Sequence, residues 1–389
     1  MEELTSVNPE VLKWARESAG MTIQDVVLKM KRKKITYEIV HAWETGEKSP
    51  SYPQLERLAY ELYKRPLALF FFPSPPEEVT PKQSFRTLPE YEINNIPREM
   101  RLLLRKAQSL QLNLIELYDG VNPSERKILD DLHFDVNLPL EEMGKTVRNY
   151  LSVDMETQTS LGNPENAFKF WRNKLEQFGI FVFKDTFKNE DFSGFCLYDN
   201  VFPIIYINNS KPPTRQIFTL FHELAHLFFE TGGIDTQIED YIEHLQGENR
   251  QIEILCNKFS GEFLVPSDDF DEQLKKHSLD FDKLSSIYHV SKEVLLRKAL
   301  EKGLIDRLTY EEQVNMWKAG SSKKTSNKAG GPSYYLIKSI YLGEKYIERS
   351  FAKYYQNRIS MEELAGYLGV KVKNLPGMEA QFGQMGSFE

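Results

Sequence analysis

The sequence of 389 residues has only two cysteines, Cys196 and Cys256, which excludes a disulfide framework and a cysteine-rich zinc site. It has no long hydrophobic run either, because the longest, Leu67 to Phe72, is far shorter than the ~18 residues that cross a bilayer. Its acidic start, MEELTSVNPE, is followed by no apolar stretch and therefore predicts no signal peptide. From these absences we expect a soluble, cytoplasmic protein without a membrane partner.

A large excess of charge of one sign is also missing. The 49 basic and 57 acidic side chains leave a net charge of −8, which argues against a protein that coats nucleic acid over its whole surface but permits one basic face. The chain is instead rich in core-forming residues. Its 41% hydrophobic and 12% aromatic content excludes extensive disorder. At ~150 residues per domain, the length allows two or three domains.

Two segments with few apolar residues divide the chain. Residues 77–97 are rich in proline and residues 319–332 in glycine and small polar residues, and both compositions are typical of linkers. Between and beside them we expect an N-terminal helical domain, a helical connector, a central domain with a small sheet, and a helical C-terminal region, over residues 1–76, 98–165, 166–318 and 333–389. The expected fold class is therefore α+β and mostly helical.

Hydrophobic periodicity places the main elements. The predicted strands are residues 180–183, 192–198 and 202–207 of the central domain. The longest predicted helices are residues 98–120, 214–229 and 334–356. No internal repeat is present, so repeat architectures are excluded.

Residues 9–72 have the periodicity of four short helices, and the third is predicted to extend from Thr36 to Thr45. A basic run precedes it and consists of Lys31, Arg32, Lys33 and Lys34. One interpretation is a helical bundle with a solvated turn and no ligand. The other is a helix-turn-helix, whose third helix faces the bases of double-stranded DNA while the basic run contacts phosphates. The candidate base-facing residues are Thr36, Tyr37, Glu38 and His41.

The residues that indicate chemistry are His222 and His226, with Glu223 between them. Positions i and i+4 lie on one face of a helix, so both imidazoles can bind a single metal ion while Glu223 accepts a proton from water. The alternative is a helix that carries two histidines by chance. Apolar neighbours on every side predict a buried helix, however, and two buried histidines without a partner would be costly.

A catalytic zinc ion needs three protein ligands and leaves a fourth position for water. No further histidine follows at the spacing of an extended motif, so we expect a downstream carboxylate as the third ligand. The candidates are Glu230, Asp235, Glu239, Asp240, Glu243, Glu253 and Glu262. Spacing alone places Glu253, which begins a predicted helix, only slightly ahead of Glu239 and Glu243.

These residues belong to a longer pattern. It runs Arg215-x-x-Phe218-Thr219-Leu220-x-His222-Glu223-x-x-His226 and continues with Glu253-x-x-Cys256-Asn257-x-Phe259 and Leu264-Val265-Pro266. The pattern resembles the ImmA/IrrE family of zinc metallo-endopeptidases, whose sites are gluzincin-like. The resemblance implies Zn²⁺ as the cofactor, with Glu253 as the third ligand and Glu223 as the general base. Cys256 and Ser260 stand where the family usually has alanine, so the resemblance makes neither of them a ligand.

The flanking regions resemble the family as well. Residues 9–76 are similar to the Cro/CI-type (XRE) helix-turn-helix domain that often precedes this peptidase, through Trp43-Glu44-x-Gly46, Gln54-Leu55 and Arg65-Pro66. The C-terminal part resembles the tails of long family members through Ile359-Ser360 and Glu363-Leu364-Ala365. One departure is the turn Lys-Arg-Lys-Lys-Ile before the third helix, where the family usually has a glycine.

The resemblance implies a site-specific endopeptidase of regulation. Its protein substrate would be a helix-turn-helix repressor or another product of a neighbouring gene, in a mobile-element, stress or defence system. Two alternatives stay open: a DNA-binding regulator or antitoxin-like protein whose peptidase domain serves partner recognition, and a structural or inactive metal site. Glu223 favours the enzyme, because a structural site has no use for a general base. The oxyanion donor is open among Tyr241, His244 and Arg215, and a homodimer is compatible with the sequence.

Overall fold

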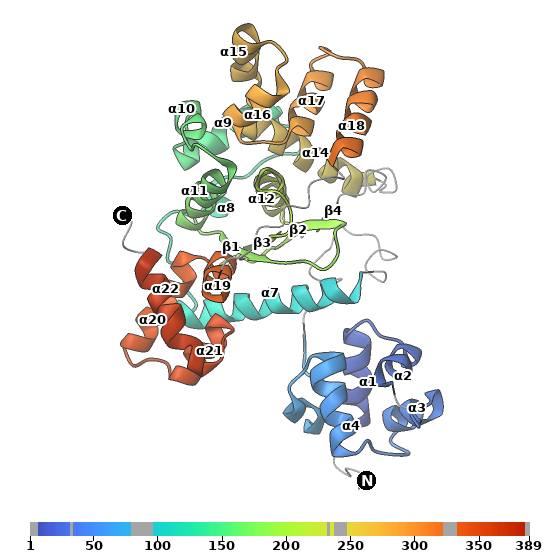
Figure 1. Cartoon of the computed structure of the whole chain (residues 1–389). Coiled ribbons are helices and arrows are strands. Elements are labelled where there is room, and N and C mark those ends of the chain that lie inside the picture. Colours follow the sequence, from blue (N-terminus) through green and yellow to red (C-terminus); the bar gives the residue numbers. More distant parts are fainter. Residues whose placement is uncertain are drawn as a thin grey trace. The chain divides into compact units, whose positions relative to one another are not determined.

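The computed structural model describes residues 7–31, 34–78, 96–231, 234–236, 247–321 and 333–385. Most of the two predicted linkers, 77–97 and 319–332, lies outside these residues, as do Arg32 and Lys33 of the basic run. The chain divides into two compact units, and the division falls within helix α7 (Arg98–Leu117), after residue 106. The mostly helical α+β fold class that the sequence predicts is confirmed (Figure 1).

Short helices make up the first unit. Local sequence explains where they begin, since Pro9 occupies the first turn of one helix and Thr22 forms a capping box with Asp25 at the start of the next. Their apolar faces meet in one core that includes Leu12 and Trp43. The elements are α1 (Pro9–Ser18), α2 (Ile23–Met30), α3 (Tyr37–Thr45), α4 (Tyr52–Arg57), the π-helical η1 (Leu58–Tyr63) and the 3₁₀-helical η2 (Leu67–Phe71).

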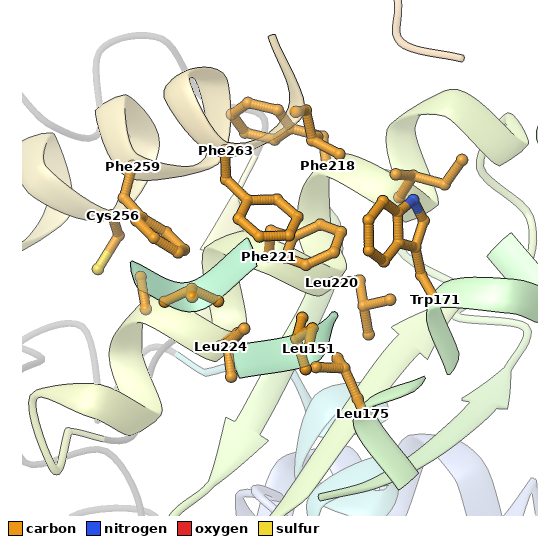
Figure 2. Packing of buried hydrophobic residues seen from close by; sticks show 14 of the residues in the cluster. Leu151, Trp171, Leu175, Phe218, Leu220, Phe221, Leu224, Cys256, Phe259 and Phe263 are labelled. Atoms are coloured by element: carbon orange, nitrogen blue, oxygen red, sulfur yellow. The ribbon is translucent and has the colours of Figure 1, made fainter. Parts of the chain in front are cut away.

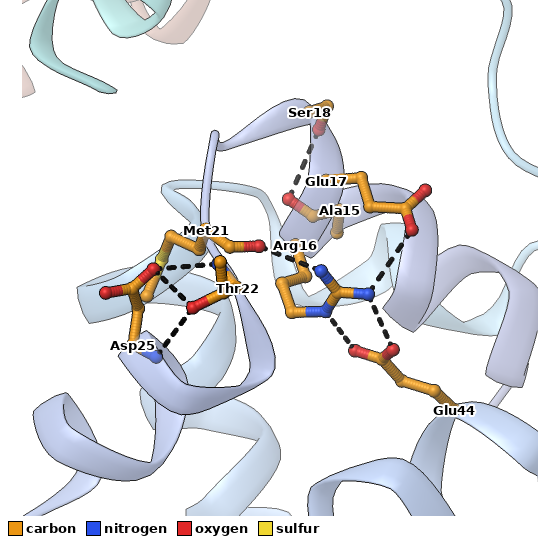
Figure 3. A network of polar contacts seen from close by, with 8 residues as sticks. All are labelled: Ala15, Arg16, Glu17, Ser18, Met21, Thr22, Asp25 and Glu44. Atoms are coloured by element: carbon orange, nitrogen blue, oxygen red, sulfur yellow. Dashed lines mark hydrogen bonds and ion pairs between the residues drawn. The ribbon is translucent and has the colours of Figure 1, made fainter. Parts of the chain in front are cut away.

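Arg16 of α1 holds α3 and the turn after α1 together (Figure 3). Its Nε and Nη2 atoms donate to the two carboxylate oxygens of Glu44 at 2.6 and 2.9 Å. Its Nη1 atom donates to the backbone carbonyl of Met21 at 2.8 Å. A bidentate pair of this kind fixes orientation as well as distance, so it sets how α3 lies against α1.

The turn between α2 and α3 begins at Lys31, whose backbone is left-handed with φ +48°. A residue with a side chain is strained there by roughly 1 kcal/mol, which is why glycine is the usual choice. Thr36 is the N-cap of α3 and Tyr37 its first residue, which agrees with a helix predicted to begin at about Thr36. Lys31 therefore adopts a conformation that glycine usually supplies.

The second unit contains a four-stranded sheet in the order β1-β3-β2-β4. Its strands are β1 (Phe181–Asp185), β2 (Phe192–Leu197), β3 (Ile204–Asn208) and β4 (Ile234–Thr236). β1 and β3 are parallel, and the other two pairings are antiparallel. The first three strands agree with the prediction to within a few residues, whereas β4 was not predicted.

The two faces of the sheet differ in what covers them. On one face Val182, Ile205 and Cys196 pack in a core with helices α11 (Pro164–Gln177), α12 (Pro213–Phe228) and α14 (Gly247–Leu264). Figure 2 shows where the three helices meet, with Trp171, Phe221 and Phe263 in contact. On the other face the ring of Phe183 lies 5.3 Å from that of Tyr346, and the ring of Phe181 lies 5.8 Å from that of Tyr118. The second face is thus covered by the C-terminal helices and by the chain that follows α7.

The C-terminal region contains two helices where the sequence predicted a single helix over 334–356. The interruption is Gly343, whose φ of +87° is left-handed and whose absent side chain leaves room for the guanidinium of Arg172. The elements here are α19 (Tyr334–Leu342), α20 (Glu344–Tyr355), α21 (Met361–Leu368), the short 3₁₀ turn η3 (Val372–Asn374) and α22 (Leu375–Met385).

The remaining helices of the second unit are α8 (Ile128–Asp131), α9 (Leu140–Leu151), α10 (Met155–Thr159), α15 (Ser267–His277), α16 (Phe281–Tyr288), α17 (Lys292–Glu301) and α18 (Arg307–Ser321). Of these helices, α9 packs against α14, and α16 packs against α17. Among the described residues, no helix combines the length and the apolarity needed to cross a membrane.

Candidate metal centre

Helix α12 runs through the core of the second unit. Pro213 occupies its first turn, where the fixed φ of proline favours helix and no hydrogen bond is lost. Every residue from Gln216 to Phe228 is buried, as expected for a helix that is apolar on all sides. His222, Glu223 and His226 are therefore enclosed, with at most 1% of each exposed.

The structure brings His222, His226 and Glu253 together. The two Nε2 atoms lie 3.2 Å apart, and the Glu253 carboxylate places Oε1 3.2 Å from Nε2 of His226 and Oε2 3.4 Å from Nε2 of His222. Glu253 belongs to α14, which packs against α12 and is held there by an aromatic core that includes Phe221 and Phe263. Two adjacent helices thus supply three convergent donor atoms, and all three side chains are buried.

The spacing of these atoms fits a tetrahedral metal ion. With metal–ligand distances of 2.0–2.1 Å, the ligand atoms of a tetrahedral zinc site lie about 3.3 Å from one another. The separation of the two Nε2 atoms and that of Nε2 of His226 from Oε1 of Glu253, both 3.2 Å, agree with that edge length. The contact of Glu253 with Nε2 of His222, at 3.4 Å, is made by its other oxygen, Oε2. Two imidazoles and one carboxylate are also the donor set of catalytic zinc sites that leave a fourth position for water.

Electrostatics favours the ionised form of Glu253. Burial raises the pKa of its carboxyl, but the attraction of His226 and the hydrogen bonds with both imidazoles outweigh burial and hold that pKa well below its usual range. The carboxylate is therefore available as an anionic ligand. Asn257 lies one turn further along α14, and its side-chain amide donates to the backbone carbonyl of Glu253 at 3.1 Å. This hydrogen bond does not involve the Glu253 carboxylate, which contacts the two histidines.

The structure also describes some of the other carboxylates that were candidates for the third ligand. Glu262 lies on α14 as well, but it forms a buried ion pair with Lys298 and accepts from Ser267 at 2.8 Å. Glu230 follows the end of α12 in the left-handed conformation. For Asp235 the structure describes the strand and not the side chain, and Glu239, Asp240 and Glu243 lie outside the described residues.

Cys256 is fully buried on α14. Burial, together with the nearby Glu253 and Glu223 carboxylates, raises the pKa of its thiol well above the usual value. The thiolate that metal binding or nucleophilic attack would need is therefore strongly disfavoured.

Of the open candidates for the oxyanion donor, only Arg215 is described. Its Nε donates to Ser193 at 3.1 Å and its guanidinium lies over the ring of Phe218. Tyr241 and His244 fall outside the described residues. Sequence reasoning missed Thr231, whose hydroxyl lies 3.0 Å from Nδ1 of His226. A threonine five residues beyond a histidine is no signal by itself, because the contact depends on how α12 ends.

The candidate DNA-binding residues belong to the first unit. Tyr37, Glu38 and His41 of α3 are exposed, and the rings of Tyr37 and His41 stack 6.2 Å apart. The N-cap Thr36 is exposed, as are Lys31 and Lys34 in the preceding turn. Arg32 and Lys33 lie outside the described residues.

Comparisons with known proteins bear on the second unit. No curated protein matches the chain. A solved structure that it resembles is a Mycobacterium tuberculosis transcriptional regulator, at 18% identity and a TM-score of 0.30, with 41% of this chain and 46% of that chain covered. The chain thus spans less than half the length of that protein. The family model described as Peptidase_M78, IrrE N-terminal-like domain, matches residues 175–300, from the end of α11 to α17. Over these residues the chain is similar to a metallopeptidase-type domain, which implies a metal cofactor.

Proposed function

We propose that the chain is a zinc-dependent endopeptidase of the gluzincin type, with His222, His226 and Glu253 as zinc ligands and Glu223 as the general base. One observation carries the proposal: two packed helices bring the buried side chains of His222, His226 and Glu253 together, with their ligand atoms within 4.8 Å of one another. Glu223 follows His222 directly on α12. The match of residues 175–300 to a metallopeptidase-type domain supports it.

The chemistry divides between the ion and the protein. Bound zinc would polarise a peptide carbonyl and lower the pKa of a coordinated water. Glu223 is fully buried beside His222, so its carboxylate acts in a site with little competing solvent. It takes the proton of the attacking water on a carboxylate oxygen and delivers it to the leaving peptide nitrogen.

The proposed substrate is a regulatory protein, such as a helix-turn-helix repressor or another product of a neighbouring gene. The helical first unit supports this view, because a fused recognition module restricts an endopeptidase to few partners. Recognition and cleavage are then separate tasks of one chain.

The variant Glu223→Gln tests the proposal. It keeps the size of the side chain but removes the base, so zinc content and thermal stability should stay at the wild-type level. General acid–base catalysis contributes roughly 10²–10⁴-fold, so cleavage should fall by that factor. The full-length, zinc-loaded chain would be incubated with the products of neighbouring genes, and cleavage followed by mass spectrometry. Glu272→Gln, on α15 and outside the cluster, is the control and should cleave normally.

Two outcomes would contradict the proposal. A Glu223→Gln variant that cleaves at the wild-type rate removes the general base from the mechanism. A variant that cleaves nothing but retains the full regulatory effect of the protein in cells shows that partner recognition, and not proteolysis, is the working function.

A second candidate function is DNA binding by the first unit, favoured by the exposed Tyr37, Glu38 and His41 on α3. If α3 faces bases, their replacement should weaken binding at specific sequences, whereas loss of Lys31 and Lys34 should weaken binding to all sequences and flatten its salt dependence. Gel shifts on the upstream region of its own gene at low salt are the measurement. If no binding is detected there, the result favours recognition of a protein, and not of DNA, by the first unit.

A further inference from the structure

The second unit contains a cavity of about 600 Å³ that is separate from the candidate metal centre. Three segments form its wall: residues 118–126 after α7, the end of α11 with the start of β1, and one face of α20. No described residue of α12 or α14 lines it. Small-molecule sites in proteins typically have volumes of about 300–1,000 Å³, so this cavity has room for a ligand.

Aromatic rings line part of the cavity. Phe181 of β1 is buried, and its ring lies 5.8 Å from that of Tyr118. Phe178, the C-cap residue of α11, contributes a third ring. Aromatic side chains pack well against flat apolar groups, so this part of the wall favours a ligand with an aromatic group.

Charged side chains of both signs line the rest of the cavity, and three of them already have partners. Glu176 is buried and accepts from Nε of Arg172 at 2.9 Å. The guanidinium of Arg126 lies 3.4 Å from the carboxylate of Asp131. Arg349 donates to a backbone carbonyl at the end of α7 at 2.8 Å. These groups are therefore engaged within the protein.

Three further charged side chains line the cavity and are still available: Glu125, Lys345 and Glu348. Within the part of the chain that the structure describes, none of them forms an ion pair or a side-chain hydrogen bond. Lys345 and Glu348 are three residues apart on α20, so their Cβ atoms lie about 5–6 Å apart on one face of the helix. The ammonium and carboxylate of an amino acid are attached to the same carbon atom, and two such neighbouring side chains can reach both.

We propose that this cavity binds a free aromatic amino acid, whose ring packs on Phe178 and Phe181 while its carboxylate contacts Lys345 and its ammonium contacts Glu348. A ligand with charge of only one sign would leave one of the two α20 side chains without a partner, whereas a zwitterion satisfies both. The inference does not depend on the proposed function, because the cavity and the candidate metal centre share no residue.

Isothermal titration calorimetry on the full-length chain tests the ligand class. L-tryptophan and L-phenylalanine are the probes, and at least one of them should bind with a Kd below about 1 mM. Indole-3-propionate lacks the ammonium of tryptophan, and tryptamine lacks its carboxylate. Each should bind roughly 10-fold more weakly than L-tryptophan, because one charge-assisted contact is lost. L-alanine, which has no ring, should not bind detectably.

Variants of α20 test the location. Ala352→Trp places an indole in the cavity and should abolish binding. Lys345→Met and Glu348→Gln each remove one charged contact and should weaken binding of the better probe about 10-fold. Lys371→Met and Glu362→Gln, which lie outside the cavity, are the matched controls and should bind like the wild type. Thermal unfolding of each variant shows whether it is folded.

The possible results separate this inference from the proposed function. Absence of binding of both probes to the wild type overturns the inference whether or not any variant folds. Binding that persists in folded Ala352→Trp overturns the site, and tryptamine or indole-3-propionate binding as tightly as L-tryptophan overturns the zwitterion. Glu223→Gln should bind the amino acid normally, so a failure of the zinc peptidase proposal leaves this inference intact, and the reverse also holds.

Discussion

Gly194 of β2 faces Thr219 of α12 so closely that a Cβ atom on the glycine would lie 2.6 Å from Cγ2 of the threonine and 3.0 Å from the carbonyl oxygen of Tyr206. Thr219 precedes His222 by three residues, so the contact lies one turn from the candidate metal centre. The glycine therefore sets how near the sheet the ligand-bearing helix can lie.

Replacing Gly194 by alanine should destabilise the protein by about 1–3 kcal/mol, because the new methyl group overpacks a buried contact. Chemical denaturation measures the loss, and the second change Thr219→Ser should recover part of it by removing Cγ2. Gly261→Ala is the control: it lies in α14, where an added Cβ meets nothing within 4 Å. That variant should gain about 0.5–1 kcal/mol, since alanine favours helix over glycine.

The histidines should carry the metal. His222→Ala and His226→Ala each leave two ligands, too few to hold zinc tightly, so we expect one zinc per chain in the wild type and almost none in either variant. His277→Ala, on α15 outside the cluster, is the matched control and should keep its zinc. The zinc content of each variant would be measured after dialysis. Full occupancy in His222→Ala or His226→Ala would show that the histidine concerned is not a ligand.

Two buried glutamates of α14 should behave in opposite ways. Glu253→Gln should lose zinc, because a carboxylate ligand becomes a neutral amide. Glu262→Gln should keep zinc in every folded molecule but lose about 3–5 kcal/mol of stability, because Lys298 is left buried without its counter-ion. Zinc content and denaturant unfolding on the same samples separate the two effects. Loss of zinc from folded Glu262→Gln would mean that the wrong glutamate has been assigned.

We expect the stability of the protein to depend on pH because of Lys184 in β1. Burial and the nearby Arg172 lower the pKa of its ammonium group to about 7, from 10.5 in an unfolded chain. Between these values the unfolded chain binds more protons than the folded one, so the free energy of unfolding should rise with pH, by at most about 1.4 kcal/mol per pH unit. Below pH 7 both states carry the charge and this contribution becomes constant.

Lys184→Met removes the titrating group and provides the comparison. The difference in unfolding free energy, wild type minus variant, should increase from pH 7 to pH 9 and stay level below pH 7. A difference that does not change over this range would show that the lysine is charged in the folded protein throughout.

The sequence could predict what depends on local spacing. His222 and His226 share a helix face by geometry alone, and Thr22, with Asp25 three residues later, is a cap pattern at a helix start that the structure contains. The third ligand could not be predicted in this way. Spacing ranked Glu253 only slightly ahead of Glu239 and Glu243, and the choice of Glu253 came from the resemblance to a family. Which carboxylate reaches the histidines depends on how α14 packs against α12, and that is a tertiary property.

The features that were missed have the same origin. Strand β4 is three residues long and exists because β2 offers it a partner. Gly343 ends a helix that periodicity continues, since Arg172 fills the space beside it. Thr231 reaches His226 only because Glu230 adopts a left-handed conformation that its residue type does not favour. Each depends on a neighbour distant in sequence or on an unusual backbone angle.

The face of the sheet that carries Phe181 and Phe183 determines which fragments of this protein can fold. A fragment limited to residues 175–300 would lack Tyr118 and Tyr346 and would expose Phe181, Phe183 and their neighbours to water. Exposed apolar surface of that kind promotes self-association. The metallopeptidase-type domain that the family model delimits is therefore smaller than the part of the chain that we expect to fold by itself. A frameshift that removes the C-terminal helices should abolish the protein by aggregation or degradation, although every proposed zinc ligand would still be encoded.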